Sequence, residues 1–258
     1  MRYSGFYYSL FKGTMKRVIA RSYGNDYANK IMKSSKTIYK KIVKAAPDMG
    51  NGNPMAYNAL FAYAFLSPYL ASNRMLKKEV VASMMEESLY HVKWYFKATN
   101  LNTTKGKLKS SKSVRKYYKW YTPEREKKYP ESFKVDFDGI PYEGASYYRI
   151  TKCPICSYAR ALGCEDLMPM LCELDRVMIK LQHGVLHRDK TIARGDEYCD
   201  YFILGDKEDI KDLKNASNTE APLEDEVLDN IENEEANQDE NALNDIEDEE
   251  GNALDNIE

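Results

Sequence analysis

Hydrophobic residues recur at helical spacing through the first half of the chain, and polar residues fill most positions between them. Between residues 25 and 45 the hydrophobic positions fall on one face of a helix. They are Tyr27, Ile31, Ile38, Ile42 and Val43. A stretch rich in Gly and Asn then breaks the pattern before Pro54, which suits the first turn of a second helix running to about Leu66.

The clearest helical pattern comes next. A single hydrophobic stripe lies largely apart from the charged residues of the same segment. It consists of Leu76, Val80, Met84, Val92 and Phe96. Residues 102–113 are polar and contain Gly, Ser and Lys, so they predict a loop, and residues 114–121 predict a short helix of basic and aromatic residues.

The pattern changes in the second half of the chain. Residues 145–152 are rich in Tyr and Ile, which predicts a strand. A short helix is expected over residues 154–162, with Gly163 as its C-terminal cap. We expect Pro169 to begin another helix, which Gly184 would close.

Two further strands are expected at residues 185–194 and 199–204, joined as a β-hairpin at Gly195 and Asp196. Alternation along the first of them would place two sets of side chains on opposite faces. The sets are His187, Asp189 and Thr191, and Arg188, Ile192 and Arg194. Together these elements predict an α+β fold, with a helical N-terminal half packed on a small antiparallel sheet that ends in a C-terminal β-hairpin.

Charge is distributed very unevenly along the chain. Residues 1–130 contain 26 Lys and Arg against 7 Asp and Glu, whereas residues 221–258 contain 16 acidic residues and no basic ones. A basic half could attract nucleic acid or an anionic membrane, but no nucleic-acid-binding motif accompanies it, so we interpret the lysines as outer helix faces. We predict one α+β domain over 1–214, helical over 1–130 and motif-bearing over 140–206, followed by a disordered acidic low-complexity tail over 215–258.

The sequence favours a cytoplasmic protein. No secretory signal is recognisable at its start, and the most apolar stretch, residues 55–66, is too short to span a bilayer. An odd number of cysteines favours reduced thiols over a framework of disulfides. The five lie in one segment of the second half, at Cys153, Cys156, Cys164, Cys172 and Cys199.

Cys153 is the first candidate for chemistry. The helix expected after it places Cys153 near the N-cap, where free backbone N–H groups and the helix dipole stabilise a thiolate. It is therefore a candidate nucleophile, and the alternative is an unreactive buried thiol. Cys172 and Asp175 share one face of the next helix, where the carboxylate could orient a substrate amine or position a water molecule. The alternative for Asp175 is a solvated side chain at a helix end.

A metal site is the main competing interpretation of these residues. Cys153 and Cys156 with His183 and His187 imitate a zinc-finger pattern, but the 26-residue gap between the pairs is long and Gly184 separates the two histidines. No phosphate-binding loop, dinucleotide-binding motif or serine-hydrolase motif is present. We predict no cofactor, with zinc or iron as the alternative.

Several of these residues occur in an order that resembles a known family. The run contains Cys153-Pro, Gly163, Cys172-x-x-Asp175, Arg188-x-x-Thr191-Ile-Ala-x-Gly195-Asp and Cys199-Asp-x-Phe202. It resembles the L-2-amino-thiazoline-4-carboxylate hydrolase family, whose C-terminal motif is a Thr-x-Ala-x-Gly-Asp stretch followed by Cys-Asp. The order of Gly195, Cys199 and Phe202 also resembles the end of the 4-vinyl reductase ligand-binding domains.

The first resemblance implies a hydrolase that opens a five-membered thiazoline ring. Water or a thiolate adds to the ring carbon between nitrogen and sulfur, the C–S bond breaks, and N-carbamoyl-L-cysteine leaves. Carried over to this chain, the motif gives a catalytic set and a substrate-binding set. The sets are Cys153, Cys172, Asp175 and Cys199, and Arg188, Arg194 and Asp196.

The second resemblance implies a different class of function, a non-enzymatic module that senses or binds a ligand or a metal. Under either interpretation the expected partner is a small molecule. Neither a membrane nor nucleic acid is expected as a partner, and the oligomeric state is left open.

Overall fold

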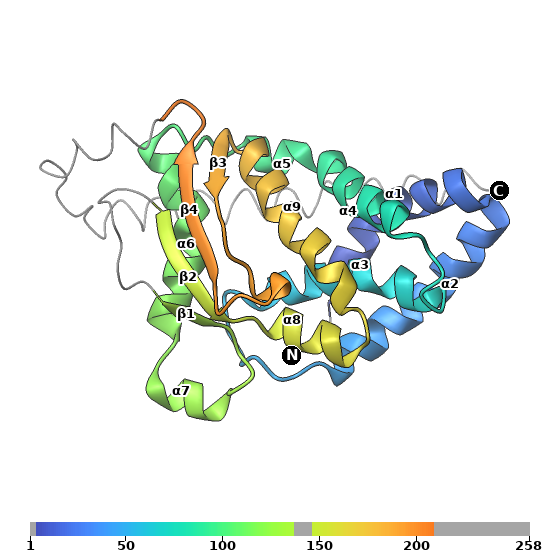
Figure 1. Ribbon diagram of the computed structural model, residues 1–258, viewed down its shortest axis with the longest axis horizontal. Helices are drawn as coiled ribbons and strands as arrows, with labels where there is room; N and C mark the ends of the chain where they lie inside the picture. Colours follow the sequence, from blue (N-terminus) through green and yellow to red (C-terminus); the bar gives the residue numbers. More distant parts are fainter. Residues whose placement is uncertain (1–3, 137–145, 209–258) are drawn as a thin grey trace, which may run out of the picture. The chain divides into compact units, whose positions relative to one another are not determined.

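The computed structural model describes residues 4–136 and 146–208 (Figure 1). Its helices are α1 (Phe6–Tyr23), α2 (Asn25–Ala45), α3 (Ala56–Ala71), α4 (Lys78–His91), α5 (Lys93–Lys97), α6 (Thr104–Trp120), α7 (Pro123–Lys128), α8 (Pro154–Ala161) and α9 (Met168–Leu181), with the 3-10 helices η1 (Glu165–Leu167) and η2 (Ile192–Arg194). Its strands are β1 (Lys134–Asp136), β2 (Ser146–Lys152), β3 (Gly184–His187) and β4 (Cys199–Gly205). Among these described helices, none is long and apolar enough to cross a lipid bilayer. The predicted acidic tail lies outside the described residues.

The prediction of a helical first half is confirmed. α2 spans residues 25–45, and α3 follows the predicted break, beginning two residues after Pro54. Because α3 packs against α1, α2 and α4, it is buried on nearly all sides and carries apolar residues around its circumference. The third predicted helix is divided at Val92 into α4 and α5.

Two buried tyrosine hydroxyls on α1 and α2 have partners. The hydroxyl of Tyr8 on α1 donates a hydrogen bond to the Met32 carbonyl at 2.9 Å and lies 2.5 Å from the hydroxyl of Ser35. Tyr39 on α2 stacks on Tyr8, with ring centroids 5.5 Å apart, and its hydroxyl donates to the Ser4 carbonyl at 2.8 Å. These contacts satisfy polar atoms that lie inside the apolar core.

The predicted loop at residues 102–113 is wrong, because α6 covers most of it. Thr103 caps this helix, and its hydroxyl oxygen accepts a hydrogen bond from the Gly106 N–H group at 3.1 Å. Leu108 and Tyr117 are buried on the side of α6 that packs against the rest of the molecule. Tertiary packing therefore stabilises a helix whose polar composition resembles that of a loop.

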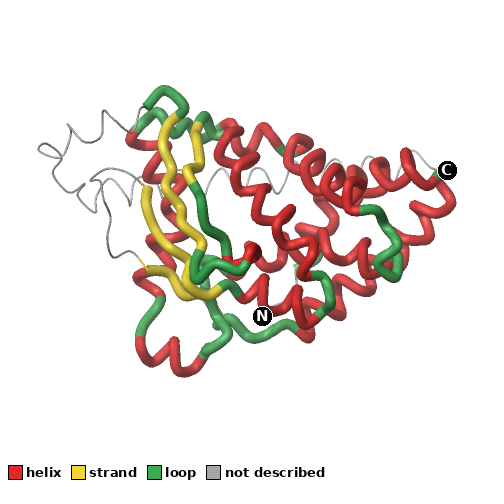
Figure 2. Tube along the Cα trace, viewed as in Figure 1, coloured by secondary structure: helices red, strands yellow, loops and turns green. Residues whose placement is uncertain are grey.

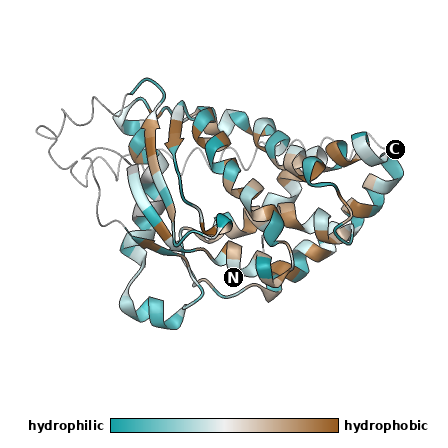
Figure 3. Cartoon of the chain, in the orientation of Figure 1, coloured by the Kyte–Doolittle hydropathy of each residue, from teal (hydrophilic) through white to brown (hydrophobic). Residues whose placement is uncertain are grey.

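The four strands of the described residues form an antiparallel sheet in the order β1–β2–β4–β3, which Figure 2 shows beside the helices. β2 and β4 pair from Ser146 with Ile203 to Ile150 with Cys199. Burial alternates along β3 and the start of β4, as expected for a sheet with one covered face. Figure 3 shows hydrophobic positions on β3 and β4 and a hydrophilic α7. The predicted α+β fold with a small antiparallel sheet is confirmed.

β3 and β4 pair as the predicted C-terminal hairpin, but the prediction of their connection is wrong. Residues 188–198 form a long connection that contains η2 and turns at Gly195, whose φ is 97°. The carboxylate of Asp200 accepts the N–H groups of Asp189 and Lys190 at 3.2 and 2.7 Å. Because these bonds replace sheet pairing, the predicted alternation of side chains between two faces does not occur there.

α9 begins beside Pro169 as predicted and lies against β3 and α4 (Figure 1). It ends at Leu181, so Gly184 is the first residue of β3 and not the end of the helix. A Cβ atom on Gly184 would lie 2.3 Å from the Leu101 side chain. The close approach of the strand to the helical region therefore requires glycine.

Candidate active site

Cys153 lies where β2 ends and α8 begins. It is the N-cap of α8, with an extended backbone (φ −116°, ψ 106°), and Pro154 occupies the first helical turn. Its thiol is half-buried and makes no capping hydrogen bond. The facing Cys156 thiol nevertheless lowers the pKa of Cys153, and the backbone amides of Cys156 and Ile155 lower it further, against the opposing effect of burial.

Four cysteines lie within electrostatic range of one another, and we call them the thiol cluster. They are Cys153, Cys156, Cys172 and Cys199. Interactions with Cys153 and then Cys172 raise the pKa of Cys156, and burial raises that of Cys199 to about 12. Burial also raises the pKa of Cys164, which lies apart beside Arg74. Cys153 is distinguished from these three thiols by its lowered pKa.

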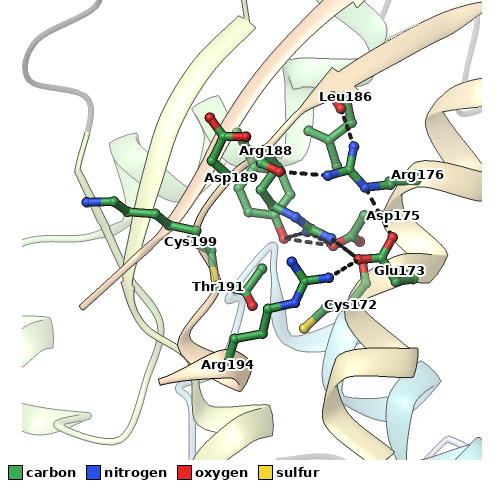
Figure 4. A network of polar contacts seen from close by, with 12 residues as sticks. Cys172, Glu173, Asp175, Arg176, Leu186, Arg188, Asp189, Thr191, Arg194 and Cys199 are labelled. Atoms are coloured by element: carbon green, nitrogen blue, oxygen red, sulfur yellow. Dashed lines mark hydrogen bonds and ion pairs between the residues drawn. The ribbon is translucent and has the colours of Figure 1, made fainter. Parts of the chain in front are cut away.

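A buried ion pair lies beside the thiol cluster (Figure 4). Arg188 donates from Nη1 to Asp175 Oδ2 at 2.7 Å and from Nη2 to the Cys172 carbonyl at 2.5 Å. The hydroxyl of Tyr201 donates to the same Asp175 oxygen at 2.8 Å. Burial alone would lower the pKa of Arg188, whose side chain is 1% exposed, but Asp175 and Tyr201 outweigh it and raise that pKa. Arg188 is therefore a fixed positive charge committed to Asp175.

Asp175 keeps part of its carboxylate available. Within the described residues both of its hydrogen bonds use Oδ2, and its side chain is 27% exposed. Its negative charge also opposes ionisation of Cys153, which shows that the two groups lie within electrostatic reach. The ring of Tyr148 on β2 stacks on the ring of Tyr201 on β4, with centroids 4.7 Å apart. This stacking holds the Tyr201 hydroxyl in place against Asp175. Oδ1 can therefore accept a hydrogen bond from a ligand next to the thiol cluster.

Two further arginines surround this pair, and Figure 4 shows all three converging on Glu173 and Asp175. Arg176 donates to the carbonyl groups of Leu186 and Arg188 at 2.6 and 2.7 Å and so ties β3 to α9. Arg194 has a side chain that is 52% exposed, and it donates to Glu173 at 3.1 Å. Of the two predicted carboxylate-binding arginines, Arg194 is the accessible one.

Asp196 lies in the connection between β3 and β4, where its carboxylate accepts the Thr191 N–H at 2.8 Å. The N–H of Asp196 donates in return to the Thr191 carbonyl at 3.2 Å. Cys199 also contacts this connection, because its sulfur accepts the Ile192 N–H at 3.2 Å. Asp196 thus shapes the turn, and its substrate-binding role stays a prediction.

Two buried hydroxyl groups near the thiol cluster have no hydrogen-bond partner among the described residues. They belong to Tyr63 on α3 and to Thr191. Burial, Tyr158 and then the charge of Cys153 raise the pKa of Tyr63, so its hydroxyl lies within electrostatic range of that thiol. Thr191 is 2% exposed and is seen in Figure 4 between the sulfurs of Cys172 and Cys199. An unpaired buried hydroxyl costs about 1–3 kcal/mol, which a bound ligand or water can offset.

The sequence alone predicts no role for either hydroxyl. Tyr63 lies within a continuous apolar run and looks like any other core aromatic residue. Thr191 falls in the motif of Thr, Ala, Gly and Asp, but it was assigned to a strand face. Only the motif could have drawn attention to it.

The residues proposed for a zinc site do not meet. The imidazole of His183 lies 3.8 Å from Asp206, and His187 packs on the ring of Phe202. In the part of the chain that the structure describes, no three side chains of His, Cys, Asp or Glu are arranged as metal ligands. The thiol cluster is therefore close in space without the geometry of a metal centre.

Comparison with known proteins gives one match. The family model described as L-2-amino-thiazoline-4-carboxylic acid hydrolase matches residues 57–203, which include Tyr63, the thiol cluster and the buried ion pair. No curated protein and no solved structure matches the chain. The resemblance to the 4-vinyl reductase domains stays a prediction.

Proposed function

The chain belongs to the L-2-amino-thiazoline-4-carboxylic acid hydrolase family, and on this basis we propose that it hydrolyses a small cyclic amidine of the thiazoline type, with Cys153 as nucleophile. L-2-amino-thiazoline-4-carboxylate is the first substrate to test. The observation that carries the proposal is the position of Cys153 at the start of α8, where its pKa is lowered while those of Cys156, Cys164 and Cys199 are raised.

The reaction proceeds in two steps. The Cys153 thiolate adds to the ring carbon between nitrogen and sulfur, and the ring C–S bond breaks. The substrate sulfur leaves as a thiol after taking up a proton, and its carbon stays bound to the enzyme sulfur as an isothiourea. Water then adds to that carbon, the C–S bond to Cys153 breaks, and N-carbamoyl-L-cysteine leaves with the oxygen of water as its carbonyl.

Asp175 and Arg194 bind the two charged ends of the substrate. Asp175 Oδ1 accepts a hydrogen bond from the protonated amidine, while Arg188 and Tyr201 hold the carboxylate through Oδ2. Arg194 pairs with the substrate carboxylate, because it is exposed and its acidic contact among the described residues is Glu173, which a substrate carboxylate can replace. Arg188 acts by positioning Asp175 and does not touch the substrate.

The unpaired hydroxyls of Tyr63 and Thr191 complete the site. Burial raises the pKa of Tyr63, so its hydroxyl stays protonated and can donate a hydrogen bond to the sulfur that leaves the ring. The Thr191 hydroxyl accepts a hydrogen bond from the substrate amidine or from the attacking water. Both groups then gain the partner that they lack in the described structure.

The test is turnover of L-2-amino-thiazoline-4-carboxylate by the full chain, followed as formation of N-carbamoyl-L-cysteine by mass spectrometry. Cys153→Ser should lower kcat/KM on the order of a thousandfold or more, while Cys164→Ser, a matched buried thiol outside the cluster, should retain it. Full turnover by Cys153→Ser would assign the addition step to water and remove the covalent intermediate.

A second measurement tests the reactivity of Cys153 independently of which substrate the protein hydrolyses. Iodoacetamide should alkylate Cys153 at pH values below 9.0, the ordinary pKa of a thiol, where Cys164 and Cys199 remain unmodified. Fast alkylation without turnover of the thiazoline would retain the nucleophile and direct the search to other amidines, amides or thioesters. Equal alkylation of all three thiols would contradict the proposal.

A further inference from the structure

The arrangement of Cys153 and Cys156 provides more than one reactive thiol. Cys153 is the N-cap of α8, and Cys156 follows three residues later on the same side of the first turn. Residues at this spacing on a helix bring their Cβ atoms within about 5–6 Å, and a disulfide needs about 3.5–4.5 Å. Pro154 fixes the backbone of the first turn and the two thiols interact directly, so the adjustment that joins the sulfurs falls on Cys153 at the N-cap.

The two thiols differ in a way that suits consecutive roles. Cys153 is half-buried and can meet a small molecule, whereas Cys156 is 5% exposed and faces Cys153 from inside the protein. The largest cause of the raised pKa of Cys156 is its interaction with Cys153. When the sulfur of Cys153 becomes bonded to another sulfur, it no longer carries negative charge, and the main opposition to ionisation of Cys156 disappears.

We propose that Cys153 and Cys156 form a dithiol site that exchanges with small-molecule disulfides, an activity separate from hydrolysis of a ring. The Cys153 thiolate attacks one sulfur of the disulfide, a mixed disulfide forms, and one small thiol leaves. Cys156 then loses its proton to solvent and attacks the sulfur of Cys153, and the second small thiol leaves. The two cysteines are oxidised to one disulfide, and the small disulfide is reduced to two thiols.

Cys172 is the competing partner, because it also interacts with Cys156. It belongs to α9, so a bond from Cys156 to Cys172 would join two separate helices. Cys153 and Cys156 lie in the first turn of α8, so their bond stays within one element. The inference therefore names one pair, and it stands on thiol geometry whichever substrate the site hydrolyses.

The experiment treats the reduced full chain with oxidised glutathione, blocks remaining thiols with iodoacetamide in denaturant, and maps tryptic peptides by mass. Trypsin cuts after Lys152 and Arg160, so Cys153 and Cys156 fall on one peptide, while Cys172 falls on the next. The expected product is the peptide 153–160 lacking two hydrogens, with Cys164 alkylated. A cross-link between the two peptides, or a stable glutathione adduct in the unmutated chain, would overturn the proposal.

Variants distinguish the attack of Cys153 on the small disulfide from the later attack of Cys156 on Cys153. Cys156→Ser should accumulate glutathione on Cys153, because the resolving thiol is gone, and Cys153→Ser should react at least about tenfold more slowly. Cys164→Ser is the matched control and should form the same disulfide as the unmutated chain. Formation of the disulfide at an unchanged rate in Cys172→Ser supports the named pair, and its loss in that variant contradicts it. The readout is mass alone, so its result is independent of whether the thiazoline is hydrolysed.

Discussion

The helices α1 and α2 and the surroundings of the thiol cluster both bury polar groups, but in different ways. In the first, the hydroxyls of Tyr8 and Tyr39 bond to backbone carbonyls of the same region. In the second, Tyr63 and Thr191 lack hydrogen-bond partners among the described residues, and Arg188 is buried beside the Asp175 carboxylate. The comparison teaches that polar groups in the helical region stabilise the fold, whereas those around the thiols are arranged for a ligand.

The largest expected effect tests the buried ion pair. Arg188→Met leaves Asp175 without its cation and should lower the free energy of unfolding by about 3–5 kcal/mol, measured by urea denaturation. Arg194→Met removes an exposed arginine of the same site and should cost less than about 1 kcal/mol. Similar losses for both variants would show that burial of Arg188 has no special importance.

Next in size is the effect of an unpaired hydroxyl on catalysis. Thr191→Val removes a group that bonds to nothing in the described residues, so the free energy of unfolding should stay the same or rise slightly. If Thr191 binds substrate, kcat/KM for the thiazoline should fall about a hundredfold. Lost stability with unchanged turnover would place Thr191 among the structural hydroxyls instead.

A pair of tyrosines gives the most direct comparison of the two regions. Tyr8→Phe removes a hydroxyl that contacts Met32 and Ser35 and should cost about 1 kcal/mol. Tyr63→Phe removes a hydroxyl with no partner among the described residues, so it should cost nothing in chemical denaturation, while turnover slows. Equal destabilisation by the two changes would mean that Tyr63 has a structural partner.

The smallest expected effect is a dependence of stability on pH. The pKa of Cys153 in the folded chain is lowered from 9.0, so the unfolded chain binds more protons between the folded value and pH 9.0. The stabilisation from Cys153 is therefore fully present above pH 9.0 and is lost as the pH falls through the folded pKa. The difference in the free energy of unfolding between the unmutated chain and Cys153→Ser should therefore grow as the pH rises through this window.

Cys164→Ser serves as the control for that measurement. Burial raises the pKa of Cys164, so its stabilising contribution is present below pH 9.0 and is lost only at higher pH. The difference in the free energy of unfolding between the unmutated chain and Cys164→Ser should stay constant over the pH window in which the difference for Cys153→Ser grows. The same rise in both variants would assign the pH dependence to other groups.

Local patterns were enough to predict much of the fold. α2 and β2 follow from periodicity and residue type, and Pro154 with Gly163 marks both ends of α8. α6 could not be predicted in this way, because its stability comes from a few buried residues and the Thr103 cap within a polar sequence. The connection over 188–198 was also hidden, since side-chain bonds from Asp196 and Asp200 replace a strand that the residue types favour.

The candidate site shows the same division. Cys153 could be identified from the sequence because its N-cap position depends only on the next residues. The pairing of Arg188 with Asp175 joins residues on α9 and in the later connection, and no local pattern reveals it. Tyr63 belongs to a helix about ninety residues before Cys153, so its place beside the thiol depends wholly on tertiary packing.

The position of β4 in the sheet affects the order in which parts of the protein can fold during synthesis. This strand comes last among those described, yet it pairs with both β2 and β3 and carries Cys199 and Tyr201. A nascent chain that has emerged only to residue 190 already contains α1 to α9, but it lacks Thr191 and the tyrosine that holds Asp175. Pairing over such sequence distances is slow compared with helix formation. During synthesis, the helices can therefore fold well before the reactive centre is assembled.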